Sequence, residues 1–167
     1  MDKMSIEDKM RLVLALAKEG LQQGEIPIAA IVFHGDEIIS KAYTTEKKDG
    51  RFLVHADLQA MLEMDKKKYP ISVRREMQLF ANLEPCMMCF GTVIHSFIGE
   101  VYYSFESPTD GGAVWAEKTW SCYHKESTFK LPKIYKCILA NESKELFRKF
   151  LEICPEGGLH DWVKTLV

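Results

Sequence analysis

Two short segments with metal-binding side chains most constrain how this chain can fold. The first is Val54-His55-Ala56-Asp57 and the second is Glu84-Pro85-Cys86-Met87-Met88-Cys89, with 30 residues between His55 and Cys86. Each segment stands where a loop or an extended stretch passes into the first turn of a predicted helix. Thirty residues are enough for one helix, a loop and one strand, after which the chain is back at the same edge of a sheet. The spacing therefore predicts two helix starts that lie side by side.

The residue types in these segments favour a metal site. A Cys-x-x-Cys pair at a helix start directs both sulfurs at one ion, and helix N-termini favour thiolates. His55 adds a third ligand to Cys86 and Cys89. Three protein ligands leave one position of Zn²⁺ open for water, which is typical of catalytic zinc. A thioredoxin-like redox pair is the alternative interpretation, and the histidine upstream makes it the weaker one.

The remainder of the chain alternates between helical and extended patterns. An amphipathic helix is expected over residues 5–19, with Ser5 as its N-cap and Gly20 as its end, followed by a hairpin with strands over 26–33 and 38–43. Further helices are expected from Val54 to the lysines at 66–68, from Pro85, and over 142–153; further strands are expected over 78–83, 101–105 and 134–139, and loops over 44–51 and 107–112. This order predicts an α/β fold with helices on both faces of a mixed sheet.

Length and charge narrow the class of protein. The 167 residues suit a single domain over 1–167, with a C-terminal helical extension over about 142–167. A formal net charge of −2 supplies no general field that gathers phosphates. The longest apolar run, Ile26–Phe33, is far shorter than the ~20 residues of a membrane span. With no recognisable signal peptide and an odd number of cysteines, five, we expect a cytoplasmic protein with reduced thiols and no membrane partner.

The metal motif and its flanks resemble the cytidine deaminase superfamily, in the branch that includes bacterial tRNA adenosine deaminases and guanine deaminases. The zinc deaminases share the pattern H-x-E followed by P-C-x-x-C. The resemblance rests on Gly24-Glu25-Ile26-Pro27-Ile28-Ala29-Ala30, His55-Ala56-Asp57, Leu83-Glu84-Pro85-Cys86-Met87-Met88-Cys89, Ile94-His95-Ser96-Phe97-Ile98 and, more loosely, Ile138-Leu139-Ala140-Asn141-Glu142. It implies a three-layer α/β/α sandwich around a five-stranded mixed sheet, with zinc at the ends of two adjacent helices.

The same resemblance implies a zinc-dependent hydrolytic deaminase of a nucleobase or nucleoside. His55, Cys86 and Cys89 would hold the Zn²⁺, and Asp57 would move the proton. The family has Glu at the position of Asp57, and the shorter side chain withdraws the carboxylate by about 1 Å, a displacement that can cost ~10²-fold in rate. A zinc-binding member with low activity or none is therefore an alternative.

Five residues are expected to contact substrate: Ala29, Thr44, Ala56, Glu84 and Trp115. Relatives often present Asn where this chain has Thr44, which offers one hydroxyl in place of an amide. Trp115 belongs to an aromatic segment over 114–124 that either borders the active site, where stacking a base is worth ~1–3 kcal/mol, or packs in the core or a dimer interface. Cys122 and His124 are not expected to bind the metal, because a fourth protein ligand would close the site.

The expected partner is a small nucleobase or nucleoside. A tRNA substrate is the less favoured alternative, because residues 141–167 hold four basic and five acidic side chains and so offer no basic tail for a phosphate backbone. A homodimer is expected from the resemblance and from apolar surface at Met87, Met88 and Phe90.

Overall fold

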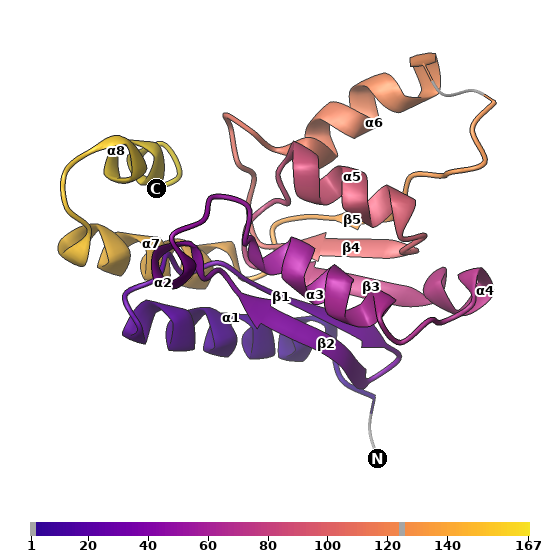
Figure 1. Cartoon of the computed structure of the whole chain (residues 1–167), viewed down its shortest axis with the longest axis horizontal. Helices are drawn as coiled ribbons and strands as arrows, with labels where there is room; N and C mark the ends of the chain where they lie inside the picture. The colour runs from indigo at the N-terminus through magenta and orange to yellow at the C-terminus, as the bar shows by residue number, and fades with distance from the viewer. Residues whose placement is uncertain (1–2, 124–125) are drawn as a thin grey trace.

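The computed structural model describes residues 3–123 and 126–167 and centres on a five-stranded mixed sheet (Figure 1). Its strands are β1 (Ala29–His34), β2 (Glu37–Tyr43), β3 (Met77–Ala81), β4 (Glu100–Tyr103) and β5 (Lys133–Tyr135), in the order β2-β1-β3-β4-β5. β1 is antiparallel to both of its neighbours, whereas β3, β4 and β5 are parallel. It follows that β2 and β3 run in the same direction.

Helices cover both faces of this sheet (Figure 1). On one face lie α3 (Ala56–Asp65), α5 (Met87–His95) and α6 (Gly112–Tyr123), and on the other lie α1 (Ile6–Gln22) and α7 (Ala140–Ile153). Alternate residues of β1 serve the two faces: Val32 packs toward α3 and α5, while Ile31 and Phe33 pack toward α1. The expected three-layer α/β/α sandwich with a five-stranded mixed sheet is confirmed.

The described residues also form three shorter helices, α2 (Glu46–Asp49), α4 (Ile71–Arg74) and α8 (Gly158–Lys164). α8 packs on α7, and Val163 and Leu166 join Phe147 and Phe150 in a separate apolar cluster. Ile26 and Leu83, at the edge of the sheet, belong to the same cluster. The C-terminal segment thus folds back over the edge at which β3 ends.

The first helix begins as its sequence predicts and ends later. Ser5 and Asp8 form a capping box, in which the Ser5 hydroxyl accepts the Asp8 amide and the Asp8 side chain accepts the Ser5 amide. The expected end at Gly20 is wrong, because the helix continues to Gln22. Gly20 instead permits close packing, since a Cβ there would lie 2.9 Å from Cδ2 of Tyr43.

Several expected boundaries shift for local reasons. The strand expected over 134–139 stops at Tyr135, because the backbone at Cys137 and Leu139 leaves the extended region with φ of 63° and 51°. The loop expected over 44–51 contains α2, and the segment over 114–124 lies largely on α6. The helix expected to reach the lysines at 66–68 ends at Asp65, and α4 follows Pro70.

The apolar surface expected for a dimer is only partly present. Met87 is 55% exposed, but Phe90 is buried, so the expectation of an exposed Phe90 is wrong. Phe90 is covered by the start of α6, where Gly112 lies so close that a Cβ would be 2.7 Å from Cβ of Phe90.

Among the described residues, no helix has the combined length and apolar character that crossing a bilayer needs.

Asn82 connects three elements and generates a test of the fold. Its Oδ1 accepts the Ala29 amide at 2.8 Å, and its Nδ2 donates to the Pro27 carbonyl at 2.7 Å and to the Ser143 hydroxyl at 3.1 Å. Because each buried group left unpaired is costly, we expect Asn82→Ala to lower the free energy of unfolding by about 2–4 kcal/mol in urea titrations. The exposed Asn141, replaced by Ala, is the control and should change that free energy by less than ~0.5 kcal/mol. Equal unfolding midpoints for the two variants would contradict this role for Asn82.

Candidate metal centre and active-site cavity

The sheet topology brings His55 and Cys86 together. α3 follows β2 and α5 follows β3, and because β2 and β3 run in the same direction, both helices start at the same edge of the sheet. His55 is the N-cap residue of α3, and Cys86 is the N-cap residue of α5. The expected meeting of two helix starts is confirmed.

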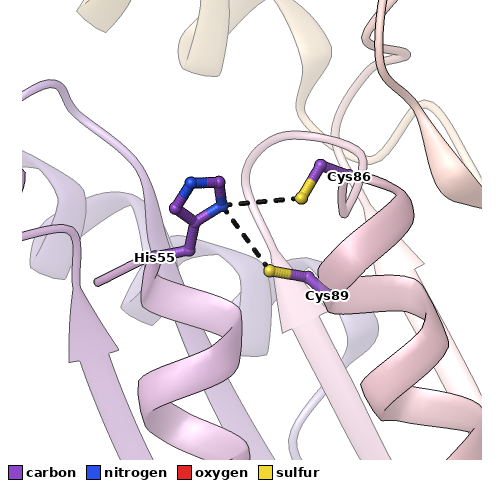
Figure 2. A group of neighbouring side chains, drawn as sticks. All are labelled: His55, Cys86 and Cys89. Carbon is purple, nitrogen blue, oxygen red and sulfur yellow. Dashed lines mark hydrogen bonds between the residues drawn. The ribbon is translucent and has the colours of Figure 1, made fainter. Parts of the chain in front are cut away.

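The side chains at these helix starts converge on one point (Figure 2). Nδ1 of His55 lies 3.5 Å from Sγ of Cys86 and 3.6 Å from Sγ of Cys89. In tetrahedral zinc sites, with Zn–S near 2.3 Å and Zn–N near 2.0 Å, a sulfur and a nitrogen ligand lie about 3.5 Å apart. The three side chains therefore fit a Zn²⁺ ion, with the fourth position left to water or substrate.

The charges at this edge are arranged for a cation. Hydrogen bonds from Cys89 and His55 lower the pKa of Cys86, whereas donating to Cys86 and being buried raise the pKa of Cys89. The neighbouring Cys86 and Glu46 raise the pKa of His55 to about 10. Burial, together with the charge of Cys86, raises the pKa of Asp57 to about 7. A divalent cation bound here would take the place of protons on the thiols, because metal-binding sulfur ligands are deprotonated.

A cavity of about 210 Å³ opens beside the cluster. Its lining residues are Ile26, Ile28, Thr44, Glu46, His55, Asp57, Leu83, Glu84, Cys86, Asp110, Leu159 and Trp162. Of the residues expected to contact substrate, Thr44 and Glu84 line it, and Asp57 lies in the same wall. The Ala56 amide donates to Oγ1 of Thr44 at 3.2 Å, which directs that amide at the cavity wall rather than at a ligand.

Ala29 and Trp115 lie elsewhere. Ala29 is buried in β1 with its amide on Asn82, and Trp115 is 50% exposed on α6, so neither lines the cavity. The aromatic side chain that lines the cavity is instead Trp162. Its indole N–H donates to Oγ1 of Thr109 at 3.0 Å, which fixes the ring. Cys122 is exposed near the end of α6, and His124 lies outside the described residues.

Glu84 has a structural role in the cavity wall. Its two carboxylate oxygens accept the amides of Ser107 and Val114 at 3.0 and 2.9 Å, and burial raises its pKa. Gly111 packs against the same carboxylate so closely that any side chain there would overlap it. Glu84 therefore holds the loop before α6 against the metal centre.

Sequence reasoning missed several residues of the site, among them Glu46, Asp110, Leu159 and Trp162. Glu46 fell in an expected loop, yet its Oε1 lies 3.1 Å from Nε2 of His55. Leu159 and Trp162 follow the last metal ligand, Cys89, by 70 and 73 residues and reach the cavity because α8 packs on α7. Their sequence neighbourhood carries no motif, so only the tertiary fold reveals them.

Comparison with known proteins defines the class. Residues 3–105 match the family described as the cytidine and deoxycytidylate deaminase zinc-binding region. The chain belongs to this family, whose members are zinc-dependent deaminases that hydrolyse a C–N bond, and both the expected resemblance and the expected zinc are confirmed.

The chain is similar to particular relatives in sequence and in fold. It is 29% identical over 147 residues to the tRNA-specific adenosine deaminase of Rickettsia bellii, covering 86% of this chain and 97% of that protein. It is 32% identical over 111 residues to the tRNA-specific adenosine deaminase of Aquifex aeolicus, covering 66% and 73%. In fold, it is similar to guanine deaminase from Nitrosomonas europaea, with a TM-score of 0.69, 20% identity, and coverage of 90% and 86%.

The ligand set predicts the outcome of cysteine substitution. We expect about one zinc per chain in the parent protein and loss of most of that zinc in Cys86→Ala, because two ligands remain where three are needed. Metal analysis after purification without chelator measures both. Cys122→Ala, which removes an exposed thiol on α6, is the control and should keep the parent's zinc. Full metal content in Cys86→Ala would contradict the assignment.

Proposed function

We propose that this enzyme deaminates an amino-substituted nucleobase or its nucleoside in the cavity beside His55, with Asp57 moving the protons. One observation carries the proposal: within the described part of the chain, Oδ1 of the buried Asp57 has no hydrogen-bond partner. A buried carboxylate oxygen without a partner is costly to a protein that gains nothing from it. Its place in the wall of the cavity supports a role toward a bound ligand.

The chemistry follows from the groups at this edge. Zinc held by His55, Cys86 and Cys89 would supply an activated water near neutral pH. Asp57 takes a proton from the attacking water and passes it to the ring nitrogen, then takes the proton of the newly added hydroxyl and gives it to the amino group, which leaves as ammonia. Burial raises the pKa of Asp57, which favours a carboxyl that can hold a proton between these steps. Water and an amino-substituted ring carbon are thereby converted into a carbonyl and ammonia.

The cavity supports a base as the group that is enclosed. Its volume of about 210 Å³ is below the ~300–1,000 Å³ typical of sites for larger ligands, which suits a single ring system. Among the described residues, the lining includes four carboxylate side chains and neither Lys nor Arg: Glu46, Asp57, Glu84 and Asp110. Such a wall attracts ring N–H and amino groups and repels phosphate. The indole of Trp162 supplies a surface on which the base can stack.

A tRNA adenosine deaminase is the second candidate, and sequence similarity to the Rickettsia bellii and Aquifex aeolicus enzymes favours it. In that reaction the base would be flipped out of the RNA and into the same cavity. All phosphate contacts would then lie outside the cavity.

A homodimer also remains part of our proposal, supported by the exposed Met87 on α5.

A screen for ammonia release separates the candidates. The substrates are cytosine, guanine and adenine, their nucleosides, and a tRNA anticodon stem-loop. We expect the highest kcat/KM with a base or nucleoside, because the described lining of the cavity includes no Lys or Arg to hold the phosphates that flank a flipped base. Turnover of the RNA alone would establish the second candidate. A zinc-loaded protein that releases ammonia from none of them would contradict the catalytic proposal.

Substitution of Asp57 tests the proton transfer. Asp57→Asn keeps the size of the side chain and removes its proton chemistry, so we expect unchanged zinc content and a kcat lower by ~10²–10⁴-fold on the best substrate. Asp57→Glu should raise kcat, because the longer side chain advances the carboxylate by about 1 Å toward the reacting atoms. Asp65→Asn, at the exposed far end of α3, is the control. Equal kcat for Asp57→Asn and the parent would refute the assignment.

A further inference from the structure

We propose that Glu46 is a positioning residue for the metal centre, holding the imidazole of His55 so that Nδ1 faces the two thiols. Oε1 of Glu46 lies 3.1 Å from Nε2 of His55, and Nδ1 on the opposite side of the ring lies 3.5 and 3.6 Å from the sulfurs (Figure 2). This inference rests on the metal centre of the proposed function and not on the identity of the base.

The direction of the hydrogen bond follows from the chemistry of imidazole. When Nδ1 gives its lone pair to a metal, Nε2 must carry the proton and can only donate. A carboxylate that accepts from Nε2–H fixes the tautomer and the ring orientation and makes the metal-bound nitrogen more basic. Within the described part of the chain, Glu46 is the partner that Nε2 has. His55 is thus held between a carboxylate and the metal position.

A second carboxylate fixes Glu46 in place. α2 has only four residues, too few to form a stable helix without tertiary support. Its N-cap residue, Thr45, does not supply that support, because its hydroxyl donates to Asp49 at 2.7 Å. The carboxylate of Glu25, which is 2% exposed, accepts the amides of Lys47 and Lys48 at 3.0 and 2.7 Å. Glu25 therefore anchors the first turn of α2, from which Glu46 projects toward His55.

The chain contains a similar histidine–carboxylate pair away from the metal centre. Nε2 of His34 lies 3.2 Å from Oε2 of Glu76, at an exposed site at the far end of β1. The two pairs have nearly the same separation, but only the pair with Glu46 adjoins thiols and lines the cavity. Glu76 is thus a matched control for the removal of a glutamate that pairs with histidine.

Zinc release tests the inference. The full-length protein is loaded with one zinc per chain, and transfer of the metal to an excess of a coloured chelator is followed in time. We expect Glu46→Ala to release zinc ~10–100-fold faster than the parent. Glu46→Gln retains an oxygen acceptor at the same place and should release zinc at an intermediate rate. Glu76→Ala should release zinc at the parent's rate.

A spectroscopic measurement separates positioning from general destabilisation. In the zinc-loaded parent, we expect the Nε2–H proton of His55 to be visible by NMR as a hydrogen-bonded signal, and we expect that signal to shift or disappear in Glu46→Ala. The metal-free forms of parent and variant should unfold at similar temperatures, because both side chains of the pair are partly exposed. Glu25→Gln, which loses one acceptor for the α2 amides, should also accelerate zinc release.

Two results would overturn the inference: parent-like zinc release from Glu46→Ala, or an unchanged Nε2–H signal in that variant. A parent protein that binds zinc and deaminates no base would contradict the proposed function but not this role of Glu46, because zinc release does not depend on turnover. A parent that binds no zinc would overturn both. The three failures are therefore distinguishable.

Discussion

The antiparallel pairing of β1 with both β2 and β3 decides where the chemistry of this protein lies. It makes β2 and β3 run in the same direction, so the helices that follow them start at one edge of the sheet. Ala30 pairs with Ala81 in this region, and both are buried beneath α3 and α5, where small side chains let the helices approach the sheet closely. Strand direction therefore brings the two helix starts together, and the side chains at those starts then form the metal cluster.

The same arrangement of helices creates a positive electrostatic potential at this edge, and acidic side chains lie where that potential favours them. α3, α5 and α6 all begin at this edge, and the amino end of a helix favours negative groups. Cys86 stands at the start of α5, Asp57 in the first turn of α3, and Glu84 accepts the Val114 amide near the start of α6. Helix ends alone do not balance these charges, since burial still raises the pKa of Asp57. The divalent cation of the family supplies the remaining positive charge.

The features that the sequence predicted are those that depend on neighbours in the chain. Ser5 caps its helix three residues before Asp8, and Cys86 and Cys89 share one helical turn, so short spacing was enough to recognise both. The alternation of strands and helices was likewise sufficient for the layers. The end of β5 was not predictable, because the left-handed backbone at Cys137 belongs to a residue type that rarely adopts it. The helix end expected at Gly20 was wrong because the lack of a side chain there permits packing against Tyr43 and does not mark the end of the helix.

The parts of the cavity wall on α2 and α8 could not be predicted from the sequence, because neither helix is stable through its own residues. α2 depends on the buried carboxylate of Glu25, and α8 depends on the packing of Val163 against Phe147. The backbone positions of the three metal ligands are therefore fixed by the sheet and the helices that follow its strands, whereas the parts of the wall on α2 and α8 are fixed by contacts that can change while the sheet remains. This division explains why the zinc motif identifies the family without identifying the base. A fold similar to a guanine deaminase and a sequence similar to tRNA adenosine deaminases are compatible, since the family match over residues 3–105 includes all three metal ligands and does not include α8.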